Sequence, residues 1–485
     1  MQNSTLSFHE RSVSELQQWL NEGKTTSYEL VSFYFEQIAK HNDRGAGLRA
    51  VLEINPDALV IARQLDKERS ETGARGPLHG IPVLLKDNID TADHMHTSAG
   101  SKLLEHSYAK ADAPLAENLR KAGAIILGKA NMTEWANFMT EGMPSGYSSR
   151  GGQVLNPYGP GVFDVGGSSS GSAAAVAANF VTVAVGTETS GSILSPASQN
   201  NLVGIKPTVG LISRRGVIPI SSTQDTAGPI ARTVQDAAYL LEALASKYEQ
   251  DPVTLTQPEQ PNYQDALQKD GLQGLRIGLQ WEPFFSSLDE EKQQLLQRAL
   301  DVCTEHGALL DKEAALQKPE KPWGADVLIY EFKTALESYL RTLDPSLGIR
   351  TIEDIMAKHH EDPNALLRYG QTLFEQTSKT SGTLTEPEYI ESLLFDQRNT
   401  REEGIDKVLR ERNLDLLVYP NNYGAMIPAK AGYPSITVPA GFTKAGEPVG
   451  ITFTGPAYSE PLLIQAAYAF EQATHFRRAP QLSMG

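Results

Sequence analysis

The alternation of two kinds of segment between about Gly80 and Leu241 constrains the fold of this chain most. Short apolar runs at 81–85, 124–127 and 180–185 have the composition of buried strands. An amphipathic segment at 115–122 and an alanine-rich one at 172–179 separate them and favour helices. Strands that alternate with helices at this spacing are typical of an α/β fold, in which helices cover both faces of a sheet.

The remaining segments extend this pattern. Residues 14–41 carry two amphipathic helical patterns, and Thr26 and Glu29 have the spacing of a capping box. We expect residues 1–70 to form a helical scaffold, 71–245 a catalytic core, about 285–410 a helical insertion, and 411–485 a segment that completes the sheet with strands at 414–419 and 435–438. The polar stretch 257–270, with two prolines, resembles a linker.

Composition excludes several classes of partner. The chain has 485 residues, with 43 Lys and Arg against 59 Asp and Glu, a formal net charge of −16. This acidic balance disfavours nucleic acid or an anionic membrane as a partner. The single cysteine, Cys303, lies in an amphipathic stretch and is expected in the core. The sequence has neither an apolar run of about 18 residues nor a signal-peptide pattern, so we expect a cytoplasmic protein.

Two glycine-serine runs carry candidate chemistry. Ser168 lies in 166–172, and Ser192 lies 24 residues further on, in 186–192. The first run leads directly into the helix-forming segment 173–178, which indicates a tight turn at a helix start rather than a flexible linker. In the second run, backbone N–H groups of 189–192 follow a strand, and such donors can form an oxyanion hole.

A serine nucleophile needs a base, and the sequence offers a lysine rather than a histidine. None of the ten histidines lies in a catalytic motif, and we expect His94 and His96 to be hydrogen-bonded loop residues rather than metal ligands. Lys86 ends the apolar run 81–85, where burial would lower the pKa of its amine. The adjacent Asp87 would keep Lys86 protonated, but strand alternation predicts that it faces the other side.

These residues resemble the amidase signature family. Its lysine after a Gly-Ile-Pro-Val strand, its Gly-Gly-Ser-Ser turn and its Gly-Ser nucleophile appear here in order and spacing. The match continues through 128–135, 204–210, 225–229 and 432–441. The resemblance implies a single domain, 1–485, built around a mixed twisted sheet with helices on both faces. It implies no cofactor and no metal.

Roles follow from the resemblance residue by residue. It implies that Ser192 attacks the amide carbonyl, that Ser168 relays the proton from a cis-peptide conformation, and that neutral Lys86 is the base. Thr189, Ser190, Gly191 and Ser192 would supply oxyanion N–H groups. Asn131, Met143 and Ser169 are candidate substrate contacts. Core packing explains Met132 and Trp135 as well as a place in an apolar substrate cleft does.

The residues after the nucleophile narrow the substrate. Many members of the family have an arginine two or three positions after it, whereas this chain has Ile193, Leu194 and Ser195. The sequence is therefore most similar in form to peptide amidases, and we expect an amidohydrolase that acts on uncharged linear carboxamides. The alternatives are a glutamyl-tRNA amidotransferase A-like glutaminase, which would work with partner chains, or a non-catalytic binding module on the same scaffold. The sequence leaves the oligomeric state open.

Overall fold

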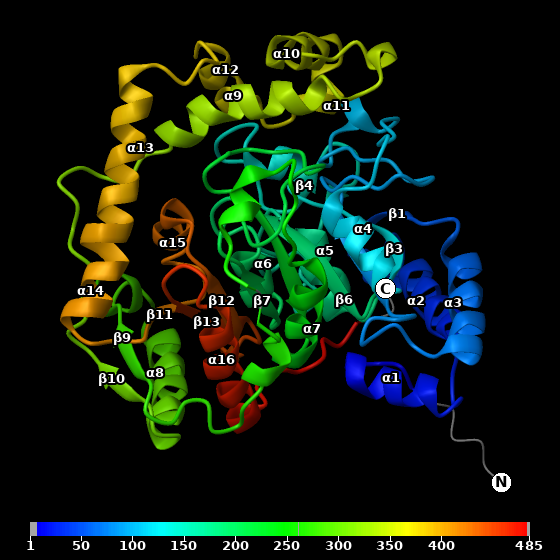
Figure 1. Ribbon diagram of the computed structural model, residues 1–485. Coiled ribbons are helices and arrows are strands. Elements are labelled where there is room, and N and C mark those ends of the chain that lie inside the picture. The colour runs from blue at the N-terminus through cyan, green and yellow to red at the C-terminus, as the bar shows by residue number, and fades with distance from the viewer. Residues whose placement is uncertain (1–6, 260, 483–485) are drawn as a thin grey trace.

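A large mixed sheet organises the computed structural model, which describes residues 7–259 and 261–482 (Figure 1). Its strands are β1 (Val51–Ile54), β2 (Pro82–Lys86), β3 (Ile125–Ala130), β6 (Val183–Glu188), β7 (Val203–Lys206), β8 (Thr226–Ala231), β9 (Arg276–Leu279), β10 (Leu309–Asp311), β11 (Leu416–Pro420), β12 (Ser435–Phe442) and β13 (Pro448–Thr454). A separate hairpin pairs β4 (Tyr147–Ser148) with β5 (Gly152–Gln153).

The strand order is β1-β3-β2-β6-β8-β7-β12-β13-β11-β9-β10. β2 runs parallel to both β3 and β6, and β9 runs parallel to both β10 and β11. The other neighbouring pairs are antiparallel. The chain is therefore an α/β protein with a mixed sheet, as predicted. The C-terminal ends of β2 and β6 lie at the same edge, where Lys86 and the segment after Glu188 meet.

Helices pack on both faces of the sheet. α5 (Ser170–Ala177) and α6 (Leu194–Gln199) contact each other and the central strands. α4 (Pro114–Lys121), α7 (Val234–Leu244), α16 (Glu460–Thr474) and α8 (Glu290–Glu305) form a second connected layer. The remaining helices of these parts are α1 (Val13–Asn21), α2 (Ser27–His41), α3 (Ala58–Thr72), α14 (Asp406–Glu411) and α15 (Met426–Ala431). Thr26 and Glu29 form the predicted capping box of α2.

Five helices of the insertion arch over one end of the sheet and descend along one side (Figure 1). They are α9 (Asp326–Leu340), α10 (Ile352–Glu361), α11 (Pro363–Leu366), α12 (Thr372–Ser378) and α13 (Pro387–Thr400). Phe332 and Phe374 from these helices pack with Met132, Trp135 and Ile218 in an apolar cluster separate from the main core. The insertion is thus anchored on the loops at the Lys86 edge of the sheet.

Three details differ from the sequence-based expectations. β1 lies within the segment expected to form a helical scaffold and pairs with β3, and β10 lies within the expected helical insertion. The segment expected as a linker packs against the body, with Tyr263 buried, while its residue 260 lies outside the described residues.

Cys303 is buried in the core, as predicted. Across residues 7–259 and 261–482, no helix combines the length and the apolar character needed to span a membrane.

Candidate active site

Lys86 ends β2 with its side chain fully buried. Its Nζ lies 2.8 Å from Ser168 Oγ, 2.8 Å from Thr187 Oγ1 and 3.1 Å from the Thr187 carbonyl oxygen. These three oxygens match the three N–H donors of an ammonium group. Among the described residues, no carboxylate forms an ion pair with Lys86. The amine is therefore held by neutral groups only.

Burial lowers the pKa of Lys86 to about 7, and the negative charges of Glu188 and Asp225 limit that fall. A lysine in water is almost wholly protonated at neutral pH because its pKa is about 10.4. A pKa near 7 leaves about half of the amine neutral at pH 7, which gives it a lone pair that can accept a proton. The position of Lys86 thus suits a general base.

Asp87 faces the other side, as strand alternation predicts. Its Oδ2 accepts hydrogen bonds from Ser98 Oγ and from the Gly100 N–H at 2.9 Å. Its Oδ1 lies 3.2 Å from Arg150 Nη1. The carboxylate next to Lys86 in sequence is therefore satisfied elsewhere.

Ser168 lies in a tight turn that leads into α5. Gly166 has a φ of 69°, and a Cβ there would lie 2.7 Å from the backbone of Pro196, so the approach requires glycine. The Gly167–Ser168 peptide bond is cis. The next residue fixes the turn, because Ser169 Oγ donates to the Thr187 carbonyl at 3.1 Å and accepts from the Thr187 N–H at 3.2 Å.

Ser192 lies between β6 and α6, close to this turn. The Ser169 N–H donates to the Ser192 carbonyl at 3.1 Å, which joins the two serine segments. Ser192 is 8% exposed, and its Oγ makes no hydrogen bond to any described residue. The structure thus contains the Lys86–Ser168 hydrogen bond and brings Ser192 beside it. Catalytic hydrogen bonds are often completed only when substrate binds.

The side chain of Glu188 binds backbone N–H groups within and just after the predicted oxyanion segment, 189–192. Its Oε1 accepts from the Gly191 N–H at 2.6 Å, and its Oε2 accepts from the N–H groups of Ile193 and Leu194 at 2.7 and 3.0 Å. Gly191, expected as an oxyanion donor, therefore uses its N–H within the protein. In the described chain, the N–H groups of Ser190 and Ser192 make no hydrogen bond. The loop thus keeps donors that a substrate could use.

A second carboxylate holds the other side of the segment. Asp225 Oδ1 accepts a 2.6 Å hydrogen bond from Thr189 Oγ1, and burial raises the pKa of this carboxyl. Its Oδ2 accepts from the N–H groups of Ile220 and Ser221 at 2.8 and 2.9 Å. Sequence reasoning noted the motif 225–229 but gave Asp225 no role, because its partner lies 36 residues away.

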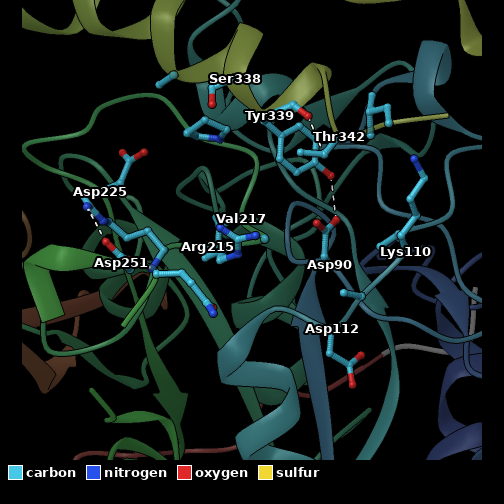
Figure 2. Close-up of a pocket in the computed structure, with 18 of the residues that line it drawn as sticks. Asp90, Lys110, Asp112, Arg215, Val217, Asp225, Asp251, Ser338, Tyr339 and Thr342 are labelled. Carbon is cyan, nitrogen blue, oxygen red and sulfur yellow. Dashed lines mark hydrogen bonds and ion pairs between the residues drawn. The ribbon is translucent and has the colours of Figure 1, made fainter. Parts of the chain in front are cut away.

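A cavity of about 510 Å³ opens beside Asp225 (Figure 2). Its walls include Arg215 and Val217 on one side and Ser338 and Tyr339 of α9, with Thr342 just after that helix, on the other. A smaller cavity of about 10 Å³ reaches Thr187, Glu188 and Thr189, and it shares Arg214, Val217 and Asp225 with the larger one. The smaller space holds about one water molecule. The two cavities therefore lie next to each other, and the smaller one borders Thr187, whose side chain and carbonyl hold Lys86.

The three expected substrate contacts have internal roles here. The Asn131 side chain donates to the Arg49 carbonyl at 3.0 Å and accepts from Ser148 Oγ at 2.8 Å. Ser169 uses its hydroxyl on Thr187, as described above. Met143 packs in the apolar cluster of the insertion with Met132 and Trp135. Asn131 and Ser169 thus lack a free polar group for substrate, and Met132 and Trp135 are core residues.

The two loop histidines are hydrogen-bonded, as predicted. His94 Nδ1 lies 2.6 Å from Asp57 Oδ2, and His96 Nδ1 lies 2.9 Å from Glu53 Oε1. Within the described ranges, no group of three or more His, Cys, Asp or Glu side chains could hold a metal ion. Each histidine is thus held by a carboxylate of another segment.

Comparison with known proteins identifies the family. Residues 29–464 match the Amidase family. A peptide amidase from Stenotrophomonas maltophilia is 43% identical, with a TM-score of 0.92 over 98% of this chain and 99% of that one. An amidase family protein from Bacillus anthracis str. Ames is 42% identical, with a TM-score of 0.93 over 98% and 93% of the two chains. The A component of the glutamyl-tRNA(Gln) amidotransferase from Thermosynechococcus vestitus is 31% identical over 97% of this chain and 99% of that protein.

Fold, site and similarity define one class: the chain belongs to the amidase signature family. It is a hydrolase that acts on the carbon–nitrogen bonds of amides. The resemblance seen in the sequence motifs is thereby confirmed.

Proposed function

We propose that this enzyme hydrolyses uncharged carboxamides, among them C-terminal amides of peptides, through an acyl-enzyme on Ser192. The observation that carries the proposal is the buried Lys86 amine, hydrogen-bonded to Ser168 Oγ at 2.8 Å beside the Ser192 segment. A neutral lysine can activate a serine that lies within reach of such a relay.

In the proposed mechanism, Ser168 relays protons between Ser192 and Lys86. Ser168 takes the proton of Ser192 Oγ as it passes its own to Lys86 Nζ, and the Ser192 oxygen attacks the amide carbon. When the C–N bond breaks, the leaving nitrogen receives a proton from Lys86 through Ser168, so ammonia or an amine departs uncharged. Water then attacks the ester carbon and its proton passes through Ser168 to Lys86. As the ester C–O bond breaks, this proton returns through Ser168 to Ser192 Oγ, and the carboxylic acid departs.

The charge that develops on the carbonyl oxygen needs donors. The N–H groups of Thr189, Ser190 and Ser192 are the proposed set, while that of Gly191 holds the loop on Glu188. One such donor contributes about 3 kcal/mol to the transition state. The Glu188 and Asp225 hydrogen bonds support a rigid loop, which stabilises charge without rearranging during the reaction.

The substrate class rests on two facts. Ile193, Leu194 and Ser195 follow the nucleophile, so this stretch provides no cation for a substrate carboxylate. The peptide amidase from S. maltophilia, at 43% identity over almost the whole chain, supports peptide amides as substrates. Action without nucleic acid or membrane partners, and a cytoplasmic location, stay predictions.

The test compares two serines near the turn. Ser192→Ala should abolish ammonia release from a panel of amidated peptides, aryl amides and fatty amides. Ser172→Ala is the matched control, because this hydroxyl lies in α5 and donates to the Val185 carbonyl. The control should keep most of the activity. Ammonia release by Ser192→Ala at the wild-type rate would refute the proposal.

A glutaminase component of an amidotransferase is the second candidate, favoured by the 31% identity to the T. vestitus protein. Such a component would work with partner chains. The purified single chain should release ammonia from peptide amides faster than from free glutamine. A preference for glutamine that appears only with partner proteins would favour the amidotransferase role.

A further inference from the structure

Glu331 links the helical insertion to a loop of the catalytic edge. It lies on α9 and is 1% exposed. Its Oε2 accepts hydrogen bonds from Ser221 Oγ at 2.5 Å and from Thr223 N–H and Oγ1, both at 3.1 Å. Its Oε1 accepts from Tyr389 OH on α13 at 2.9 Å. One carboxylate of the insertion therefore fixes a loop that has no helix or strand of its own.

The same loop holds the oxyanion segment. The N–H of Ser221 donates to Asp225 Oδ2 while its hydroxyl donates to Glu331, so one residue contacts both carboxylates. Asp225 in turn accepts from Thr189 Oγ1 at 2.6 Å. Gln224 Nε2 adds a 3.4 Å contact to the Thr189 carbonyl. A continuous chain of hydrogen bonds thus runs from α9 to the segment that precedes Ser192.

Phe332 of α9 packs in an apolar cluster with Ile218 and Ile220, but loop 221–225 consists of polar residues and is joined to α9 through Glu331. The cavity of about 510 Å³ separates α9 from the loop over the next two turns of the helix, with Ser338 and Tyr339 on its wall (Figure 2). At its far end Tyr339 OH donates to Asp90 Oδ1 at 2.7 Å. α9 therefore borders the cavity between two hydrogen-bonded side chains, Glu331 and Tyr339. Of these two, Glu331 is the one that binds the loop containing Asp225.

We propose that Glu331 is a positioning residue for amide hydrolysis: it holds loop 221–225 so that Asp225 orients Thr189 for the oxyanion hole. The inference rests on the proposed function at Ser192. It makes the helical insertion part of the catalytic apparatus, with Glu331 acting through loop 221–225 and Asp225.

Glu331→Gln tests this inference, since an amide has one acceptor oxygen and cannot receive all four hydrogen bonds. We expect kcat to fall about 10- to 100-fold with KM within about twofold, because small displacements of positioned groups slow chemistry more than binding. Asp396→Asn is the matched control. Asp396 is a buried insertion carboxylate that pairs with Lys430 at 2.5 Å and does not touch the loop. Its kcat should stay near wild type even if its melting temperature falls.

A double-mutant cycle with Thr189→Val separates positioning from general destabilisation. In the Thr189→Val background, Glu331→Gln should lower kcat no further, since both changes break the same chain. Tyr389→Phe removes one bond to Glu331 and should show the same non-additivity with a smaller loss, which keeps the test open if Glu331→Gln fails to fold. The inference would be overturned if the kcat losses of Glu331→Gln and Thr189→Val multiplied in the double variant. It would also be overturned if Asp396→Asn lost as much kcat as Glu331→Gln. An active Ser192→Ala would instead refute the proposed function itself.

Discussion

Two fully buried lysines lie on adjacent strands and face opposite sides of the sheet. Leu85 of β2 pairs with Lys129 of β3, so Lys86 and Lys129 alternate. Lys86 Nζ contacts Ser168 and Thr187, which belong to the catalytic segments. Lys129 Nζ contacts the Ile89 carbonyl at 2.6 Å and Thr97 Oγ1 at 2.9 Å. Burial lowers the pKa of both amines.

Burial alone therefore does not make a lysine a base. Four carboxylates, Asp87, Asp90, Asp93 and Glu53, oppose the fall in the pKa of Lys129, against two for Lys86. Among the described residues, Lys129 also has no serine partner that leads to a nucleophile. We therefore expect Lys86 to be essential for chemistry and Lys129 to be essential for structure.

Replacement of each lysine by methionine should separate these roles most strongly. Lys86→Met should lower kcat by about 10⁴-fold or more, because loss of one member of a catalytic unit removes most of its effect. Its fold should persist, since an apolar side chain suits the buried site. Rates of ammonia release and circular-dichroism melting curves measure both effects.

Lys129→Met should show the reverse pattern. The Ile89 carbonyl and Thr97 would lose their donor, which costs about 1–3 kcal/mol for a buried acceptor left unpaired. We expect a lower melting temperature and a kcat within severalfold of wild type at a temperature where the variant is folded. Equal loss of kcat in the two variants at full folding would remove the distinction between the lysines.

Activity should rise with pH through the pKa of Lys86, about 7. Only the neutral amine can accept the proton, so kcat/KM should fall about tenfold per pH unit well below 7 and level off above it. The profile is measured on a neutral peptide amide, with melting curves at each pH to exclude unfolding. A flat profile between pH 5 and 8 would argue against a lysine base.

Thr187→Val should give a smaller change at the same site. The ammonium form of Lys86 would lose one acceptor, so its pKa should fall and the midpoint of the pH profile should move down. The limiting kcat/KM at high pH should drop about tenfold because the amine is held less firmly. Thr97→Val, at the equivalent contact of Lys129, is the control and should leave the profile in place.

His94→Ala should have the smallest effect. Its side chain is 76% exposed and hydrogen-bonds to the exposed carboxylate of Asp57, so stability should change by less than about 0.5 kcal/mol. Neither this variant nor a chelator should alter ammonia release. A loss of activity on chelation would point to a metal ion in the reaction and contradict a mechanism carried by serine and lysine alone.

The sequence was most informative where the neighbouring residues in the sequence determine the position of a residue in the fold. Lys86 at a strand end and Ser168 in a turn before an alanine-rich helix could be placed without tertiary information. Glu331 and Ser221 meet across 110 residues, and no local pattern predicts such a contact. β1 and β10 have four and three residues, too few for a clear period of two. The hydrogen bond from the Gly191 N–H to Glu188 likewise depends on the geometry of the loop, which the sequence does not show.

Labelling by a fluorophosphonate, followed by mass spectrometry of the modified peptide, tests most directly whether Lys86 activates Ser192. We expect a single adduct on Ser192, formed at a rate that rises with pH with a midpoint near 7, and no adduct in Lys86→Met. An adduct on another residue, or labelling of Lys86→Met at the wild-type rate, would contradict this mechanism.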